Sequence, residues 1–216
     1  MEQYPVNLNL KGERVLVVGG GKVACRKVKR LISCGALIRL VSPELNQDMR
    51  FLYQNYDKIN FYHRKFDTQD LDSVFLVIAA TDRPDVNEEI ANLAHQKNLP
   101  VNVVDSVHLS NFTLPAVIDK GQLLITLSTG GNLPALSSKL RQNLEEEFGV
   151  EYDRFLKVMK KIRPKIIAKI DDPQERKQIF RKLADENIIK KFSDSRSDGL
   201  KKIKEIIGCK IELNLE

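Results

Sequence analysis

Short apolar runs alternate with helical patterns through the first half of the chain, and this alternation limits the possible folds more than any other feature. The runs fall at residues 14–18, 36–41, 60–62, 74–80 and 100–104. Strands that are apolar along their whole length are buried on both faces, as in parallel sheets covered by helices. The sequence therefore predicts an α/β fold with a Rossmann-type parallel sheet.

Two of the intervening helices carry clear boundary signals. Residues 22–34 have helical periodicity, and Gly35 follows where a helix C-cap belongs. Residues 84–96 begin at Pro84, which suits the first turn of a helix, and their apolar side chains recur on one face. Strand–helix–strand units of this kind predict that the helices cover the sheet.

The pattern changes beyond this sheet. Residues 112–118 and 122–127 predict a hairpin, and residues 134–148 predict a helix with proline in its first turn. Further helices should follow, with a kink or break at Pro164 and a polar loop at 193–198. We expect an NAD-binding Rossmann domain at residues 1–111, a small α+β segment at 112–148 and a helical domain at 149–216.

Composition excludes several classes of protein. The 216 residues are 42% hydrophobic and 30% charged, a balance typical of globular domains and not of disordered chains. No apolar run reaches the ~18 residues of a membrane span, and the N-terminus does not have the pattern of a signal peptide. We therefore expect a cytoplasmic protein that does not bind membranes.

The cysteines and histidines do not have the spacing of a metal site. The three cysteines are Cys25, Cys34 and Cys209, and none forms a CxxC pair. The three histidines are His63, His95 and His108, and none has metal-ligand spacing to another histidine or cysteine. An odd number of unpaired cysteines favours a reducing compartment. We expect no bound metal.

The net charge of +6 is concentrated in one part of the chain. Residues 1–150 carry 17 Lys and Arg against 17 Asp and Glu, whereas residues 151–216 carry 18 against 12. This distribution favours an acidic partner for the last segment, although a solvated lysine-rich helical face is the alternative. No helix-turn-helix, zinc finger or basic strand with interleaved aromatics supports nucleic-acid binding.

A glycine-rich segment of the form G-x-G-x-x-A follows the first strand and opens the first helix. Gly19 would allow the tight turn, Gly21 would let the backbone approach a pyrophosphate, and Ala24 would allow close helix–sheet packing. The phosphates would lie at the helix N-terminus, at Lys22 and Val23, where unpaired N–H groups favour negative charge. A structural turn is the alternative, and the strand–loop–helix context favours a dinucleotide site.

The acid that binds ribose in such sheets should stand at the end of the second strand. This chain has Ser42, Pro43 and Glu44 there, so Glu44 is the nearest carboxylate and lies two residues late. No Arg or Lys stands at these positions to receive a 2′-phosphate. The sequence therefore favours NAD over NADP as the cofactor.

Other polar residues follow strands at the edge where ligands bind in parallel sheets. Thr81 follows the fourth strand, Asp105 the fifth, and Ser128 the hairpin. Asp105 is the candidate for proton transfer, because the apolar run before it would partly desolvate its carboxylate. A cap or turn role is the alternative for Asp105. His108 is close enough in sequence to reach the same site.

Several ordered motifs together make the chain similar to a known family. They are YPVNL at residues 4–8, VLVVGGGKVA at 15–24, AATD at 79–82, VNVVD at 101–105, FTLPA at 112–116, STGG at 128–131, and PAL at 134–136 with Leu140-Arg141. The set resembles the precorrin-2 dehydrogenase module of the siroheme synthase family. The resemblance is dense over residues 4–148 and loose over the helical remainder.

The resemblance implies a reaction and a set of roles. Precorrin-2, a polycarboxylated tetrapyrrole, would be oxidised to sirohydrochlorin in siroheme biosynthesis, with NAD accepting the hydride and Asp105 acting as general base. The serine of the STGG motif, Ser128 here, is phosphorylated in some relatives; because its loop precedes a helix N-terminus, Ser128 could instead bind a substrate carboxylate. His108 is the other candidate for substrate binding, from its place near Asp105. The segment after the fifth strand would pair two subunits as a homodimer, and the basic helical domain would help enclose the tetrapyrrole.

Two other functions remain open from the sequence. Some relatives also insert ferrous iron, so the chain could be a bifunctional dehydrogenase and ferrochelatase. A non-enzymatic NAD-sensing regulatory module is the second alternative. Such a module needs the glycine-rich segment but has no use for Asp105 or for the basic helices.

Overall fold

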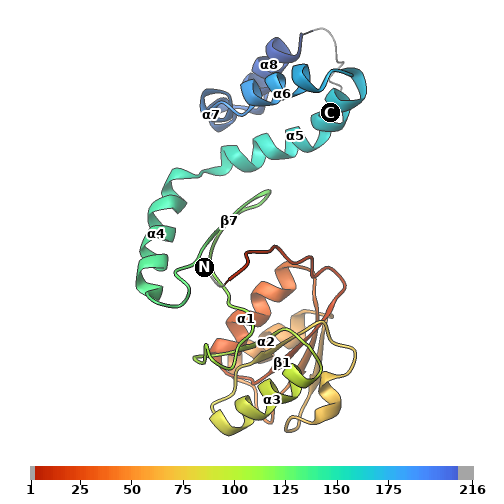
Figure 1. Ribbon diagram of the computed structural model, residues 1–216, viewed down its shortest axis with the longest axis vertical. Helices are drawn as coiled ribbons and strands as arrows, with labels where there is room; N and C mark the ends of the chain where they lie inside the picture. The colour runs from red at the N-terminus through yellow and green to blue at the C-terminus, as the bar shows by residue number, and fades with distance from the viewer. Residues whose placement is uncertain (1–2, 209–216) are drawn as a thin grey trace. The chain divides into compact units, whose positions relative to one another are not determined.

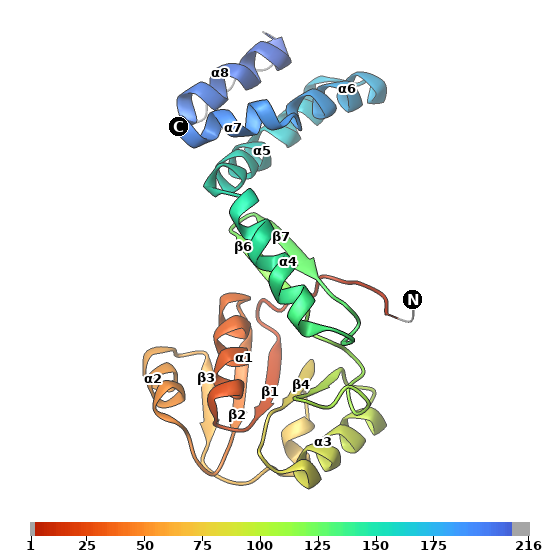
Figure 2. The same ribbon diagram turned by 90° about the vertical axis from the view of Figure 1, so that its left-hand side faces the viewer.

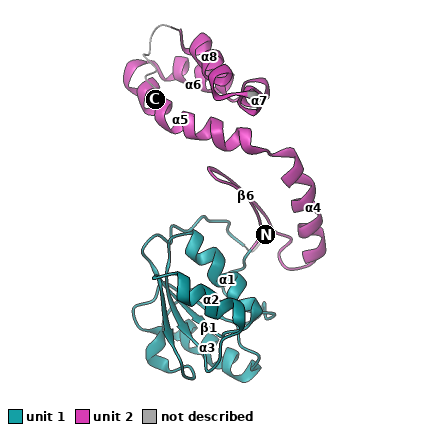
Figure 3. Cartoon of the chain, turned by 180° about the vertical axis from the view of Figure 1, so that it is seen from behind, with its two compact units in different colours: residues 1–114 teal, residues 115–216 magenta. Residues whose placement is uncertain are grey.

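The computed structural model describes residues 3–208 and divides into two compact units, Met1–Leu114 and Pro115–Glu216 (Figure 3). Within residues 3–208 no helix is both long and apolar enough to cross a membrane. Cys209 lies outside the described residues. The further division of the second unit at residue 148, and the roles expected for its two parts, remain proposals.

The first unit is built on a five-stranded parallel sheet, which confirms the expected α/β class. Its strands are β1 (Arg14–Val18), β2 (Leu37–Val41), β3 (Ile59–Tyr62), β4 (Leu76–Ala79) and β5 (Val101–Val103). They lie in the order β3-β2-β1-β4-β5, the order of a Rossmann fold. The helices are α1 (Lys22–Ser33), α2 (Gln47–Asn55) and α3 (Pro84–Gln96), with a short 3₁₀ helix, η1, at Thr68–Leu71.

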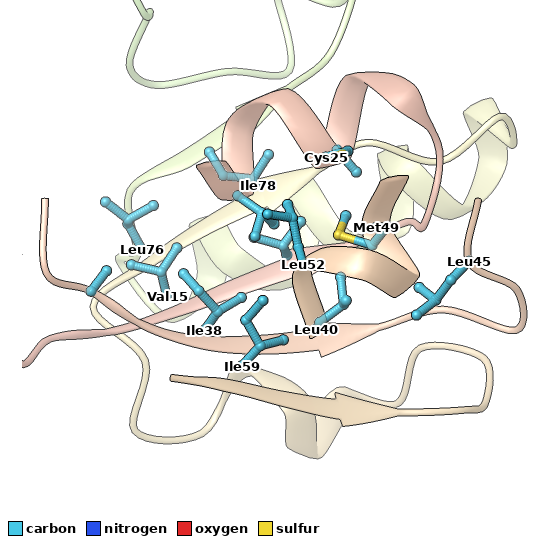
Figure 4. Packing of buried hydrophobic residues seen from close by; sticks show 14 of the residues in the cluster. Val15, Cys25, Ile38, Leu40, Leu45, Met49, Leu52, Ile59, Leu76 and Ile78 are labelled. Atoms are coloured by element: carbon cyan, nitrogen blue, oxygen red, sulfur yellow. The ribbon is translucent and has the colours of Figure 1, made fainter. Parts of the chain in front are cut away.

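Alternate residues of the central strand point into two different hydrophobic clusters. Val15 and Val17 of β1 belong to a cluster with residues of α1 and α2, whereas Leu16 and Val18 belong to a cluster with α3 (Figures 1 and 2). Figure 4 shows the first cluster, in which Met49 of α2 lies among the strand residues. Burial on both faces explains why the strands are continuously apolar, and it fixes their register.

The sequence did not predict α2 or η1. Helix α2 begins at the N-cap residue Asn46, whose side chain accepts a hydrogen bond from the Met49 backbone N–H at 2.8 Å. Its buried apolar side chains are Met49 and Leu52, which is too few for a clear periodic signal. Helix η1 is held by a capping box between Asp67 and Asp70.

The second unit begins with an antiparallel hairpin and continues as helices. The hairpin strands are β6 (Ala116–Lys120) and β7 (Leu123–Leu127). The helices are α4 (Pro134–Glu147), α5 (Val150–Lys169), α6 (Pro173–Leu183), α7 (Glu186–Asp194) and α8 (Arg196–Ile207). Helices α5 to α8 are grouped together (Figure 1), and their residues share one hydrophobic core. Phe192 is completely buried in this core.

Two local expectations for this unit, a break at Pro164 and a polar loop at 193–198, were wrong. Pro164 does not end or break α5, because Ile162 and Ile166 on either side of it are fully buried and their packing outweighs the lost hydrogen bond. A kink at Pro164 stays a prediction. Residues 193–198 are not a polar loop, since α7 runs to Asp194 and α8 begins at Arg196. The Ser195 hydroxyl caps α8 by accepting a hydrogen bond from the Asp198 N–H at 3.1 Å.

An ion pair between the exposed Arg64 and the buried Asp70 holds the connection between β3 and β4. The Arg64 guanidinium donates two hydrogen bonds of 2.7 Å to the two carboxylate oxygens of Asp70, which is 3% exposed. Burial by itself would raise the pKa of Asp70. The hydrogen bonds from Arg64 and from the Asp67 backbone N–H, with the charges of Arg64 and Arg39, outweigh burial and lower that pKa.

This ion pair predicts a pH-dependent contribution to stability. Since the pKa of Asp70 is lowered in the folded state, its stabilisation is complete above the ordinary carboxyl pKa and is lost as the pH falls through the lowered value. Near neutral pH, Asp70→Asn should reduce the free energy of unfolding in urea by about 1–3 kcal/mol. The loss should shrink in acid.

Asp72→Asn is the matched control, because Asp72 lies two residues further along and makes an exposed ion pair with Lys97. It should cost less than about 1 kcal/mol. An Asp70→Asn cost that is equal at neutral and acid pH would contradict this account.

Candidate functional site

The glycine-rich loop leaves the end of β1 through a residue that must be glycine. Gly19 has φ +120°, and a Cβ atom built on it would lie 2.2 Å from the Ala80 carbonyl oxygen at the end of β4. The Gly19 N–H donates a 2.9 Å hydrogen bond to the Val41 carbonyl at the end of β2. The expected tight turn is therefore present, and it joins the ends of three strands.

Gly20 is equally constrained, and the sequence argument did not single it out. A Cβ atom on Gly20 would lie 1.9 Å from the Glu44 carbonyl oxygen. The Gly20 carbonyl accepts a 2.9 Å hydrogen bond from the Asn46 N–H. The motif requires glycine only at the first and third of these three positions. A glycine at the middle position as well was the signal that could have shown a close backbone contact there.

Gly21 differs from its two neighbours, because no protein atom requires it to be glycine. A Cβ atom at this position would have nothing within 4 Å, and the backbone is extended with φ −82°. Gly21 is the N-cap of α1, which has no side-chain cap and no acidic residue in its first turn. The space beside Gly21 and the uncapped N–H groups of the first turn fit the phosphates of a dinucleotide.

The first turn of α1 separates exposed from buried positions. Lys22 is exposed, Val23 is half-buried, and Ala24 is completely buried in the cluster between α1 and the sheet. The small side chain of Ala24 thus lets the helix approach the strands closely, as expected from the motif.

The residues after β2 lie against the glycine-rich loop. Pro43 and Glu44 are both exposed, and the backbone of Glu44 forms the contact with Gly20 described above. The buried Ser42 hydroxyl holds this turn by donating a 2.6 Å hydrogen bond to the Glu44 carbonyl. Ser42 is therefore a structural residue that sequence reasoning missed, and Glu44 is beside the loop where a ribose-binding acid is needed.

The Thr81 side chain forms hydrogen bonds within the turn between β4 and α3. Its hydroxyl donates a 2.7 Å hydrogen bond to the Asn87 side-chain carbonyl, and the Asn87 amide donates back to the Thr81 carbonyl at 3.1 Å. Asn87 is buried. These two hydrogen bonds fix the turn that follows β4. A contact between Thr81 and the cofactor remains a proposal.

Asp105 lies in a tight turn just beyond β5. Its φ is +61°, and the Ser106 N–H closes the turn with a 3.3 Å hydrogen bond to the Val103 carbonyl. The expectation that the preceding apolar run would desolvate Asp105 was wrong. The strand ends at Val103, and the turn carries the Asp105 side chain out to an exposed position.

Helix α1 brings a half-buried cation near this carboxylate. Burial lowers the pKa of Lys27, the charge of Arg26 lowers it further, and the charge of Asp105 raises it. The turn after β5 and the glycine-rich loop also meet at the end of β4, because the Val104 N–H donates a 2.9 Å hydrogen bond to the Ala79 carbonyl and Gly19 lies against the Ala80 carbonyl. Both therefore belong to one region of the first unit.

His108 and Ser128, the two expected substrate residues, belong to different units. His108 is exposed in the first unit, with its Nδ1 3.2 Å from the Ser106 hydroxyl oxygen. Ser128 is exposed in the second unit, where its hydroxyl accepts a 3.1 Å hydrogen bond from the Gly130 N–H. The STGG loop of Ser128 leads into the N-terminus of α4, whose N-cap Leu133 has no side-chain cap.

The described residues do not contain a cluster suited to a metal ion. Among residues 3–208 no three His, Cys, Asp or Glu side chains gather in a way that could hold one. Cys25 is buried and Cys34 is exposed, and both are reduced.

Comparison with known proteins agrees with the geometry of the loop. Residues 6–116 match a protein family described as "Putative NAD(P)-binding". The chain belongs to this NAD(P)-binding family. The matched segment contains the whole parallel sheet, the glycine-rich loop and Asp105.

Curated relatives of this NAD(P)-binding chain are longer proteins. A siroheme synthase from Thioalkalivibrio sulfidiphilus is 35% identical over 205 residues, which are 95% of this chain and 42% of that protein. A siroheme synthase from Pseudomonas fluorescens is 35% identical over 180 residues, which are 83% of this chain and 39% of that protein. The chain thus spans about two fifths of the length of these relatives.

A solved structure shares the fold over almost the whole chain. SirC, a precorrin-2 dehydrogenase, is 25% identical to this chain with a TM-score of 0.74. The similarity covers 94% of this chain and 100% of SirC. The NAD(P)-binding unit and the second unit therefore both have counterparts in a protein of known structure.

The contrast between Gly20 and Gly21 predicts opposite effects of one substitution. Gly21→Ser should keep or raise the thermal midpoint, because serine is a favourable N-cap residue and has room there. The same side chain should weaken NAD binding by at least about tenfold, or ~1.4 kcal/mol, because it occupies the space for the phosphates.

Gly20→Ser is the matched control, and it should instead lower the free energy of unfolding by about 1–3 kcal/mol through overpacking against the Glu44 carbonyl. Calorimetric titration with NAD and thermal unfolding of both variants provide the two measurements. A stable Gly21→Ser variant that binds NAD as tightly as the wild type would refute the nucleotide site.

Proposed function

We propose that this chain is an NAD-dependent precorrin-2 dehydrogenase that produces sirohydrochlorin for siroheme biosynthesis. The observation that carries the proposal is the exposed carboxylate of Asp105, held in the turn after β5 at the same sheet edge as the glycine-rich loop. The similarity to SirC over 94% of the chain supports this substrate. The siroheme synthases that match most of this chain support the same pathway.

The first unit has the residues needed to hold NAD. Gly19 and Gly21, with the N–H groups of Lys22, Val23 and Ala24, form the phosphate site at the start of α1. Pro43 and Glu44 border the ribose position, and Thr81 borders the end of β4. When bound, NAD supplies the acceptor for the hydride that leaves the substrate.

Asp105 removes the proton in this proposal. Oxidation of precorrin-2 to sirohydrochlorin takes away two hydrogen atoms, one as hydride and one as a proton. A carboxylate at the sheet edge can accept that proton as a general base. Asp105 accepts no hydrogen bond from the other described residues and is exposed, so its oxygens are available to a substrate.

The remaining assignments concern the substrate. Ser128 would bind one of its carboxylates beside the uncapped N-terminus of α4, and His108 would contact the substrate next to Asp105. The excess of Lys and Arg over Asp and Glu in residues 151–216 favours a polycarboxylated ligand. The chain would then act in the cytoplasm without nucleic-acid or membrane partners.

Two substitutions at Asp105 test the reaction without straining the turn. Asn and Gly both tolerate positive φ, so Asp105→Asn and Asp105→Gly should fold normally. Both should bind NAD with wild-type affinity, because the phosphate site lies on another strand. Turnover of precorrin-2 under anaerobic conditions should fall by ~10²–10⁴-fold in both.

Asp82→Asn is the matched control, since Asp82 is an exposed carboxylate just after β4. It should keep turnover within a few fold of the wild type. Near-wild-type turnover in Asp105→Asn would rule out Asp105 as the base, and loss of NAD binding in that variant would make its role structural.

We also propose that the chain forms a homodimer through its second unit. Leu136 and Leu140 lie on one face of α4, and Leu133 is its N-cap residue. These three leucines are 39–53% exposed, and Leu124 of β7 is 45% exposed. Helices α4 and α5 pack against the hairpin, but these leucines stay exposed, so further cover is expected for them. A second copy of the same surface would bury these residues in a symmetric contact.

Introducing charged side chains on the exposed leucines of α4 tests the dimer. Light scattering of the wild-type protein at micromolar concentration should give a molar mass twice that of one chain. Leu136→Asp combined with Leu140→Asp should give the mass of one chain, because a carboxylate is costly in an apolar contact. Ser138→Asp with Gln142→Asp changes exposed polar residues of the same helix and should leave the dimer intact. A monomeric wild type would contradict the proposal.

A further inference from the structure

The turn that carries Asp105 is closed by a side chain seven residues from where the turn begins. The Ser110 hydroxyl oxygen accepts a 2.9 Å hydrogen bond from the Val103 N–H, at the end of β5. The same hydroxyl donates a 2.7 Å hydrogen bond to the Ser106 carbonyl. Ser110 thus links the residue before the turn to the residue after it, with Asp105 in between.

The backbone of Asp105 needs such support. A residue other than glycine with φ near +60° is in the left-handed region, which is less favourable than right-handed backbone for residues that have a Cβ atom. Aspartate tolerates this region better than most residues, but such a conformation persists only where its surroundings determine it. The turn's own closure from the Ser106 N–H to the Val103 carbonyl is 3.3 Å long, which is longer than the Ser110 bonds to the Val103 N–H and to the Ser106 carbonyl.

Neighbouring contacts hold the same segment to β5 without touching the turn. The Asn111 side-chain carbonyl accepts a 2.7 Å hydrogen bond from the Val101 N–H, and its amide donates to the Leu99 carbonyl at 3.0 Å. The Asn102 amide donates to the Phe112 carbonyl at 3.1 Å. These bonds attach residues 111 and 112 to β5 and to Leu99. Ser110, in contrast, is bonded to the two residues on either side of the turn.

We propose that Ser110 is a positioning residue for Asp105. Its hydroxyl fixes the left-handed turn so that the carboxylate is held at one place on the sheet edge. The inference rests on the proposed function, in which Asp105 takes the proton from the substrate. A displacement of a catalytic group by about 1 Å can cost ~10²-fold in rate, so closure of this turn has a direct catalytic consequence.

Removal of the hydroxyl should affect the chemical step more than binding. In Ser110→Ala, kcat for precorrin-2 should fall about 10–100-fold. The dissociation constant for NAD and the KM for precorrin-2 should stay within a few fold of the wild type. Ser110→Thr keeps a hydroxyl at the same atom and should restore most of kcat.

Amide hydrogen exchange supplies a measurement that does not depend on activity. The Val103 and Ser106 N–H groups should exchange faster in Ser110→Ala, while residues of β1 stay protected. Asn111→Ala is the matched control: it should speed exchange at Val101, lower the thermal midpoint, and leave kcat and the exchange of Ser106 unchanged.

The outcomes separate this inference from the proposed function. Wild-type kcat in Ser110→Ala, with turnover lost in Asp105→Asn, overturns the positioning role and leaves the reaction standing. Wild-type turnover in Asp105→Asn overturns the reaction itself. If Ser110→Ala fails to fold, Ser110→Cys keeps the shape with a weaker hydrogen-bonding group, and undiminished kcat in that variant overturns the positioning role.

Discussion

The close contact of the glycine-rich loop with two neighbouring strand ends is the constraint on which the rest of the site depends. Gly19 lies against the Ala80 carbonyl and Gly20 against the Glu44 carbonyl, at distances that exclude any side chain. Because these contacts fix where β1 ends and α1 begins, they also fix the uncapped helix N-terminus at Gly21. The same contacts set the positions of the residues after β2 and β4. The geometry of the proposed cofactor site therefore depends directly on how the sheet packs.

Much of the first unit could be predicted because its strands are buried on both faces. The helix Pro84–Gln96 was predicted to the residue, since proline marks its first turn and its apolar face is regular. Helix α2 was missed because Phe51 and Tyr53, its aromatic residues, are exposed and obscure the periodicity. In the second unit, the break expected at Pro164 is absent because packing of the flanking isoleucines decides the local structure there.

The candidate site was predictable only where a local motif defines it. The roles of Gly19 and Ala24 in packing follow from the motif. The exposure of Asp105 could not be predicted, because it depends on a turn that follows the end of β5. Ser110 had no signal in the sequence. Its hydroxyl reaches back seven residues to Val103 through an irregular loop, whereas side chains that touch within a helix are three or four residues apart.

The most direct test of the account is the stoichiometry of the proposed reaction in the wild-type protein. Precorrin-2 and NAD are mixed with the protein under anaerobic conditions, and reduced nicotinamide and sirohydrochlorin are measured by absorbance as they form. The account predicts that both appear at equal rates and that neither appears without NAD. A protein that binds NAD yet leaves precorrin-2 unchanged would contradict it, because a nucleotide-binding module without catalytic activity behaves in that way.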